Sequence, residues 1–196
     1  MKIYVEGGGD SKDLRVRCQK AFHQLITNAR PGRRQPRIVA HGGRDRTFDA
    51  FQTAHANAGA DEMIVLLVDS EAPVVKGPWD HLTDRDGWQR PENASDDQCQ
   101  LMVACMETWV LADRATLKII FKELTESALF EERTLERRTK DDVQAALEKA
   151  TKACPEARKY KKGKRSFQVL EKIDPSPLRA NLPHFARFID MLDRKL

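Results

Sequence analysis

The chain has 196 residues and a formal net charge of +4, and 40% of its residues are hydrophobic and 33% charged. This composition is typical of a globular domain with its own core rather than of a disordered chain. No apolar run approaches the roughly 20 residues that cross a bilayer. The N-terminal segment MKIYVEGGGD meets acidic residues too early for a signal peptide, so we expect a cytoplasmic protein with no membrane partner.

Charge and cysteine usage narrow the class of protein further. Residues 158–196 hold eleven Lys or Arg against four Asp or Glu, whereas the remainder has a net charge of −3. An acidic part joined to a basic part suits a metal site beside a polyanion-binding surface, although a solvated charged tail would have the same composition. The four cysteines form no CxxC pair, which favours buried, reduced thiols over zinc ligands.

The first third of the chain alternates strand and helix signals. Residues 63–68 are six consecutive apolar residues, which predicts a strand covered on both faces, as in a parallel sheet. In chain order we predict strand 2–5, a helix capped by Asp10 or Ser11, a basic loop over 30–36, strand 37–40, helix 47–58 and strand 63–68. This order predicts right-handed βαβ units.

The rest of the chain is predicted to be mostly helical. Residues 72–98 contain three prolines and two tryptophans and are predicted to form a long loop that Trp79 and Trp88 anchor. The later predicted elements are strand 99–106, a helix from Glu107 through Phe121 with Trp109 in the core, helix 141–153, a basic loop 158–165 and helices 167–173 and 183–196. We predict an α/β domain over 1–125 and a basic helical extension packed on it over 126–196.

Acidic residues follow two of the predicted strands. Glu6 ends the first strand, and Asp69-Ser70-Glu71 follows the third. Ligands of open parallel sheets bind beyond the carboxyl ends of the strands, so these carboxylates are expected to converge there. Hard carboxylate oxygens suit Mg²⁺ (or Mn²⁺), which can activate water and offset phosphate charge. Alternatively, Glu6 is an exposed strand end and Asp69 a helix cap; the pair together favours the metal site.

The glycine run after Glu6 matches no nucleotide-binding motif. Lys12 stands where a dinucleotide fingerprint has its third glycine, and no Gly-Lys-Ser/Thr of a P-loop occurs. An acidic residue immediately before the glycines would also repel a pyrophosphate unless a metal intervened. We therefore set both interpretations aside.

At this point the residues resemble a known pattern. Val5-Glu6-Gly7 with Val68-Asp69-Ser70-Glu71 is similar to the Toprim domain of topoisomerases, primases, small ribonucleases and overcoming-lysogenisation-defect nucleases. Later motifs resemble a bacterial Toprim-like family of unknown function whose members are often encoded beside an ATPase in antiphage islands. These motifs are Glu107-x-Trp109-x-Leu111-Ala112-Asp113, Lys161-x-Gly163-Lys164-x-Ser166-Phe167 and Ile173-Asp174-Pro175.

The resemblance implies a fold and a set of roles. The fold would be a Toprim-like (Rossmann-like) α/β fold, a mostly parallel sheet of about four strands flanked by helices, with a C-terminal helical extension. Glu6 would be the metal-linked acid or base, and Asp69 and Glu71 would fill Asp-x-Asp positions, Glu71 being one methylene longer than the usual Asp. Glu107 is a further candidate ligand, and Asp113 is either a further candidate or a cap.

Basic residues near the C-terminus suggest a nucleic-acid surface. The segment 158–165 has six cations around Tyr160 and Gly163, a pattern that binds phosphates by counterion release, although a solvated loop or a surface for an acidic partner remains open. The resemblance implies a lysine that stabilises the transition state, here Lys161 or Lys164. The candidate nucleic-acid contacts are Arg158, Lys159, Lys162, Arg165, Arg33, Arg34 and His41, although a hydrogen-bonded structural role explains His41 better than a phosphate contact does.

The leading hypothesis is a Mg²⁺-dependent nuclease that cleaves phosphodiester bonds of DNA or RNA as the effector of an ATPase-coupled antiphage system. The alternative is a non-catalytic binding subunit that docks on an ATPase or on nucleic acid. Phosphotransfer on a small molecule is a third hypothesis. The sequence leaves open the choice between DNA and RNA, the activating trigger and the oligomeric state.

Overall fold

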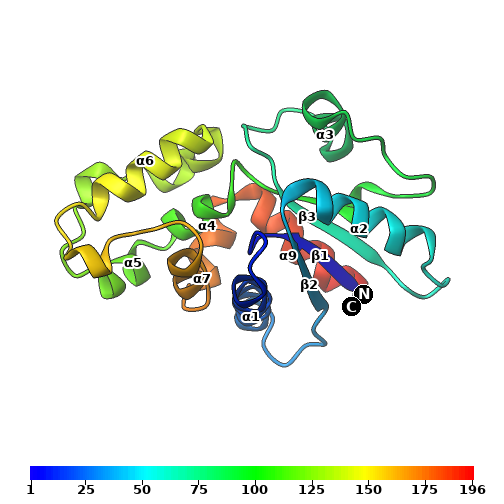
Figure 1. The fold of residues 1–196 in the computed structure, drawn as a ribbon, viewed down its shortest axis with the longest axis horizontal. Coiled ribbons are helices and arrows are strands. Elements are labelled where there is room, and N and C mark those ends of the chain that lie inside the picture. The colour runs from blue at the N-terminus through cyan, green and yellow to red at the C-terminus, as the bar shows by residue number, and fades with distance from the viewer.

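The computed structural model describes residues 1–163 and 165–196 with their side chains. Its centre is a parallel sheet, in which the described part of the chain contributes four strands in the order β2-β1-β3-β4. The strands are β1 (Lys2–Glu6), β2 (Arg37–Gly42), β3 (Ile64–Asp69) and β4 (Cys99–Met102). The α/β, Rossmann-like fold predicted from the sequence is therefore confirmed, with helices on both faces and further helices toward the C-terminus (Figure 1).

The helices follow the strands in alternation and then dominate the second half. They are α1 (Lys12–Ala29), α2 (Arg44–Ala56), α3 (Pro78–Asp86), α4 (Met106–Ala112), α5 (Arg114–Ile120), α6 (Lys140–Ala150), α7 (Lys164–Leu170), α8 (Pro175–Asn181) and α9 (Pro183–Lys195). Within the described residues, no helix is both long and apolar enough to cross a membrane.

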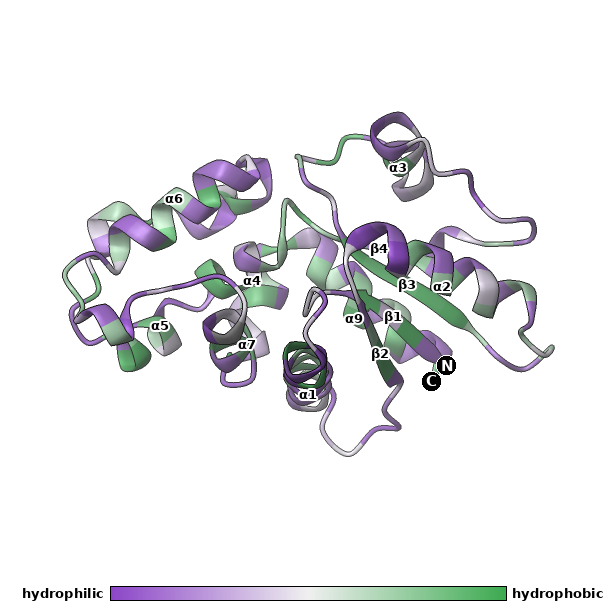
Figure 2. Ribbon diagram, viewed as in Figure 1, coloured by the Kyte–Doolittle hydropathy of each residue, from purple (hydrophilic) through white to green (hydrophobic). Residues whose placement is uncertain are grey.

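Strand β3 is buried along its whole length and is hydrophobic except at its last residue, Asp69 (Figure 2). Its side chains alternate between two hydrophobic clusters, as the two-residue period of a strand requires. Val65 and Leu67 pack with α1 and α9, whereas Leu66 and Val68 pack with the aromatic side chains of α2 and α3. This two-sided burial is why the segment reads as an uninterrupted apolar run.

The predicted loop over 72–98 contains a helix, α3, which the sequence analysis did not predict. Pro78 is its first residue, and Gly87 ends it in a left-handed conformation with φ 71°. The loop's tryptophans are buried anchors, as predicted, with Trp79 3% and Trp88 8% exposed. The Trp88 ring stacks on Phe48 of α2 at 4.1 Å between ring centroids.

Two further predicted elements have different bounds in the structure. The strand predicted over 99–106 ends at Met102, and the apolar run continues because every residue of α4 is buried. An apolar run alone does not distinguish a buried strand from a buried helix. The helix predicted through residue 121 is broken at Asp113, whose carboxylate accepts the Thr116 N–H at 3.0 Å and caps α5.

The C-terminal helices lie against the sheet and beyond it. Helix α9 packs on β4 and α7 packs on α1, while α5 and α6 lie past the carboxyl ends of the strands (Figure 1). Trp109 of α4 is fully buried between Phe22 and Phe185, which confirms its predicted place in the core. All four cysteines are buried and free. The division at residue 125 stays a prediction, since one hydrophobic cluster contains side chains from both parts.

Candidate metal centre

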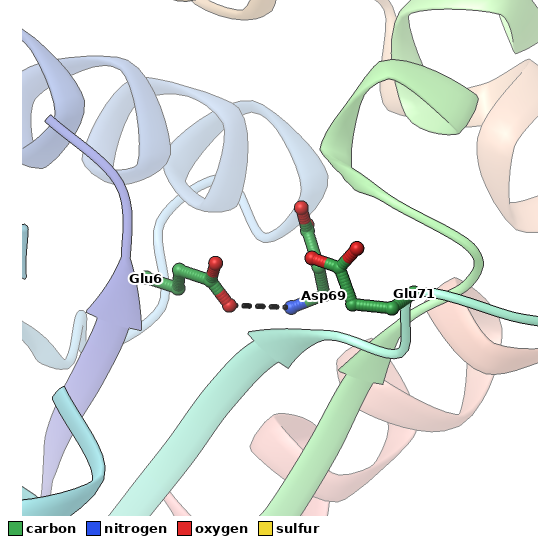
Figure 3. A group of neighbouring side chains, drawn as sticks. All are labelled: Glu6, Asp69 and Glu71. Atoms are coloured by element: carbon green, nitrogen blue, oxygen red, sulfur yellow. Dashed lines mark hydrogen bonds between the residues drawn. The ribbon is translucent and has the colours of Figure 1, made fainter. Parts of the chain in front are cut away.

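Three carboxylates converge at the carboxyl ends of β1 and β3. Glu6, Asp69 and Glu71 each offer an oxygen that lies within 4.8 Å of the other two, and their side chains point toward one another (Figure 3). The convergence follows from topology, because β1 and β3 are neighbouring parallel strands in register up to Val5 and Leu67. The backbone N–H of Asp69 also donates to Glu6 Oε2 at 3.2 Å.

Glu71 reaches the cluster through an unusual backbone conformation. Its φ is +65°, a left-handed value that costs a non-glycine residue of order 1–3 kcal/mol. Hydrogen bonds hold the segment in place, with Ser70 N donating to Met102 O at 2.9 Å and Glu71 N to Ala104 O at 2.7 Å. The extra methylene of Glu71 is thus accommodated by a turn of the chain that brings its carboxylate to Asp69.

Two cations that the sequence analysis did not single out contact the carboxylates. Lys140, the first residue of α6, forms ion pairs with Glu71 Oε1 and, at 3.5 Å, with Asp69 Oδ2. Arg44, the first residue of α2, donates to Glu6 Oε2 at 3.1 Å and to the carbonyl of Asp69. Arg85 lies farther away, with 3.8 Å between its Nη2 and Glu71 Oε2. The cluster is therefore partly neutralised by the chain itself.

Arg44 is held rigidly by groups outside the cluster. Its guanidinium forms a two-point ion pair with Asp86 of α3, with N–O distances of 3.1 and 2.6 Å, and lies over the Trp88 ring at 4.8 Å. A planar fork fixed by a carboxylate and an aromatic face loses little further entropy when it binds another oxygen. Arg44 thus fixes the position of Glu6.

The ion pairs with Lys140 and Arg44 do not fully balance the negative charge of the carboxylates. Burial, and then the carboxylates of Glu6 and Glu107, raise the pKa of Asp69 well above its usual range. Burial also raises the pKa of Glu6, with Glu71 adding to it and Arg44 opposing it. Burial lowers the pKa of Lys140, but Asp69 and Glu71 outweigh that effect and raise it overall. A site with unfavourable carboxylate charge gains from a further cation.

The donor set fits a divalent cation. Hard carboxylate oxygens on converging side chains are the ligands that Mg²⁺ and Mn²⁺ take, usually one or two together with water and phosphate oxygens. The triad Glu6, Asp69 and Glu71 could therefore hold a metal ion. A second oxygen of Asp69 is committed elsewhere, since Oδ1 accepts the Met106 N–H at 2.8 Å.

A cavity of about 260 Å³ opens beside Glu6 and Asp69. The glycine turn after β1 and the glycine pair at the end of β2 form one wall, and Glu107, Lys162 and Phe167 contribute to the rest. The two turns are joined by a hydrogen bond from Gly7 N to Gly42 O at 2.9 Å. Glycine is required where these turns meet, because a Cβ at Gly42, whose φ is +95°, would collide with the carbonyl of Gly9.

Replacing Gly42 by alanine is therefore expected to destabilise the protein by more than about 2 kcal/mol, through both backbone strain and the collision. Gly43→Ala is the matched control, because Gly43 has an ordinary φ of −70° and no atom near its Cβ position. Its cost is expected to stay below about 1 kcal/mol. Urea titration of the free energy of unfolding checks both, and equal losses would contradict the contact between the turns.

Glu107 is a buried carboxylate at the wall of the same cavity. It is 1% exposed and accepts hydrogen bonds from the Tyr160 hydroxyl at 3.1 Å and the Ser166 hydroxyl at 3.4 Å. No described Lys, Arg or His forms an ion pair with it. Burial and the Glu107 charge raise the pKa of Tyr160, so its hydroxyl remains a donor. Glu107 lines the same cavity as Asp69 and helps to raise the pKa of Asp69, but it lies outside the triad.

The predicted basic residues fall in different places. Lys162 lines the cavity, whereas Lys161 is exposed and pairs with Glu156 at 3.2 Å. The side chain of Lys164 lies outside the described residues. Lys159, Lys161, Lys162 and Arg165 line a second cavity next to the first, and Arg158 is exposed on the same loop.

The second basic patch lies away from the acids, and the side chain of His41 lines a different cavity from theirs. Arg33 and Arg34 are exposed in the loop before β2, at the opposite end of the strand from Glu6. His41 is exposed, stacks on Tyr4 at 5.6 Å and lines a separate depression with Arg46. Asp113 is a helix cap that also accepts the Asp174 N–H at 2.9 Å, which confirms the structural alternative for this residue.

Comparison with protein families gives one match, to a model described as "Domain of unknown function (DUF4276)", over residues 5–193. The chain belongs to this family. The match runs from the residue before Glu6 to α9 and so includes the whole acid cluster and the basic segment. Searches of curated proteins and of solved structures found no match.

Proposed function

We propose that this member of the family is a divalent-metal-dependent hydrolase of phosphodiester bonds in DNA or RNA. The observation that carries the proposal is the convergence of Glu6, Asp69 and Glu71 at the sheet edge, beside a cavity that also contains Lys162. Acids alone suit many cations, but acids together with a lysine at the wall of the same cavity suit a phosphate bound through a metal.

In this proposal, different residues would bind the metal, contact the phosphate and keep the cavity open. Glu6, Asp69 and Glu71 would hold Mg²⁺ (or Mn²⁺), which when bound supplies an activated water and charge neutralisation. Lys140 beside Asp69 and Lys162 at the cavity wall offer positive charge to the phosphate oxygens. The glycine turns keep side chains out of the cavity, so that a phosphodiester can approach the carboxylates.

A second function has support from the ion pairs. Lys140 and Arg44 already contact all three carboxylates, as they would in a non-catalytic subunit whose acid cluster only stabilises the fold. The resemblance to Toprim domains, the antiphage role and an ATPase partner stay predictions under either function. Titration with Mn²⁺ separates the two, because a purely structural cluster has no use for a metal.

The test of the nuclease proposal is cleavage by purified protein. Labelled single- and double-stranded DNA and RNA are incubated with Mg²⁺ or Mn²⁺ at neutral pH, and cutting is expected for at least one polymer. Glu6→Gln keeps the volume and the acceptor for Arg44 but removes the ligand charge, so its activity is expected to fall by about 10³-fold. The control is Glu62→Gln, because the partly exposed Glu62 carboxylate forms an ion pair with Lys2 alone among the described residues. Unchanged cutting by Glu6→Gln would exclude the proposed site.

A further inference from the structure

Polar and cationic residues lie on α7 and on the segments just before and after it. Arg165 and Gln168 lie three residues apart on the helix, Lys172 comes two residues after its end, and Lys161 and Lys162 come just before it. Residues three apart lie on the same side of a helix. The opposite face is buried, with Phe167 and Leu170 in the hydrophobic core. Lys161, Lys162 and Lys172 are exposed, whereas Arg165 and Gln168 are half-buried. Together these residues form a partly exposed polar stripe along α7.

The stripe joins the acid cavity to two further cavities. Lys162 lines both the acid cavity and the second cavity, of about 320 Å³. Arg165 and Gln168 line both the second cavity and a third, of about 440 Å³, which extends to Lys172 between α1 and α5. Because they share lining residues, the three cavities lie next to one another in a row that starts at the acids and follows α7. We call this row of cavities the α7 groove.

The charges of the groove favour an anion. Its two outer cavities are lined by five described cations and two acids, Glu156 and Glu171. Glu156 pairs with Lys159 and Lys161, and Glu171 pairs with Lys20. No ion pair is formed among the described residues by Lys162, Arg165 or Lys172, although Arg165 donates to the carbonyl of Ala157 at 2.6 Å. Those three cations remain available to phosphates.

We propose that the α7 groove holds the backbone of a single-stranded nucleic acid whose scissile phosphate enters the acid cavity. The inference rests on the proposed function, which supplies the reason for a phosphodiester at the inner end. A row of separated cations beside a groove is how proteins follow a single strand's phosphates. Among the described lining residues only Phe167 is aromatic, so binding is expected to depend on phosphates more than on bases.

The burial of the carboxylates in the acid cavity favours a single strand over a duplex. Asp69 is 7% and Glu107 1% exposed, so a phosphate reaches these carboxylates only by entering the cavity. A flexible strand can bend a phosphate inward. A duplex is stiff, with a persistence length of about 150 base pairs, and it would keep each phosphate in line with its neighbours.

The test measures binding without catalysis. A 5′-fluorescein dT₁₂ is titrated with wild-type protein in EDTA, and anisotropy is followed at several salt concentrations. The triple variant Lys162→Gln, Arg165→Gln, Lys172→Gln is compared with the control Lys76→Gln, Arg90→Gln, Lys195→Gln, which changes net charge equally outside the groove. Each phosphate contact contributes about 0.7 to the salt slope for single strands, or about fivefold in affinity at 0.1 M salt.

We expect the groove variant to bind dT₁₂ about a hundredfold more weakly, with a salt slope reduced by about two, and the control to stay within about twofold. An abasic 12-mer is expected to bind like dT₁₂, and a 12-base-pair duplex more weakly. Equal loss in the control, tighter binding of the duplex, or equal competition by oligoglutamate would overturn the proposal. The binding test contains no metal and is therefore independent of cleavage. If the protein binds dT₁₂ through the groove but never cuts nucleic acid, only the nuclease proposal is refuted. If it cuts nucleic acid but the groove variant binds dT₁₂ as wild type does, only this inference is refuted.

Discussion

Asp69→Asn is expected to lower the rate of metal-dependent cleavage by about 10³-fold or more. The same substitution is expected to make the metal-free protein more stable. Asp69 is 7% exposed and lies among Glu6, Glu71 and Glu107. Asparagine keeps an oxygen for the Met106 N–H but removes a buried charge that, among the described side chains, Lys140 alone pairs with. Acid clusters kept for function commonly cost stability in this way, by about 1–2 kcal/mol.

The sign of the pH dependence follows from the raised pKa values. Burial and neighbouring carboxylates raise the folded-state pKa of Asp69 and of Glu6 above their unfolded values. The stability that the protonated acids contribute is present below the unfolded pKa and is lost as pH rises through the folded pKa. The metal-free wild-type protein is therefore expected to lose stability as the pH rises from the unfolded pKa to the folded pKa of these acids. The Asp69→Asn variant is expected to lose less stability over the same pH range.

Scanning calorimetry in EDTA checks the stability of Asp69→Asn across that pH range. Each kcal/mol of change in the free energy of unfolding is expected to shift the melting temperature by about 3 °C. Asp113→Asn is the matched control, since Asp113 is also buried but accepts N–H groups from Thr116 and Asp174. The NH₂ group of the new asparagine would face one of those N–H donors. The control is therefore expected to lose about 1–3 kcal/mol of its free energy of unfolding and to retain cleavage. A lower melting temperature for Asp69→Asn would argue that the cluster is structural.

The alternation of strands and helices along the first third of the chain is what the sequence predicted best. A strand covered on both faces, such as β3, has to be apolar throughout, and a glycine turn has to follow where chains cross closely, as at Gly42. Both constraints are local and appear as sequence runs. Glu6 and Asp69 were predictable for the same reason, since parallel topology places the ends of neighbouring strands together.

Contacts made by side chains from distant helices were not predictable. Lys140 is one lysine among many, and nothing beside Thr139, which caps α6, marks it as the partner of residues 69 and 71. Arg44 follows Gly42-Gly43, so its position after a strand was a usable signal that charge alone did not single out. The reach of Glu71 depends on a left-handed backbone, which its residue type disfavours.

Lys140 decides whether the acid cluster is a metal site or an ion-pair network. Its ammonium contacts Asp69 and Glu71, where a divalent ion would also bind, so the two cations compete. Unit charges a few ångströms apart interact by about 4 kcal/mol at protein-like screening. Lys140→Met is therefore expected to tighten Mn²⁺ binding by about tenfold or more, to destabilise the metal-free protein, and to slow cleavage by removing positive charge near the phosphate.

Calorimetric titration with Mn²⁺ measures this competition directly, alongside thermal unfolding with and without the metal. Lys149→Met is the control, because Lys149 lies near the other end of the same helix and is exposed; its Mn²⁺ affinity and metal-free stability are expected to match wild type. An ion-pair network predicts a different pattern, in which Lys140→Met only unfolds more easily and neither protein binds Mn²⁺. Tighter binding together with weaker metal-free stability is the combination that a metal centre requires, because the same lysine then substitutes for the ion in its absence and obstructs it in its presence.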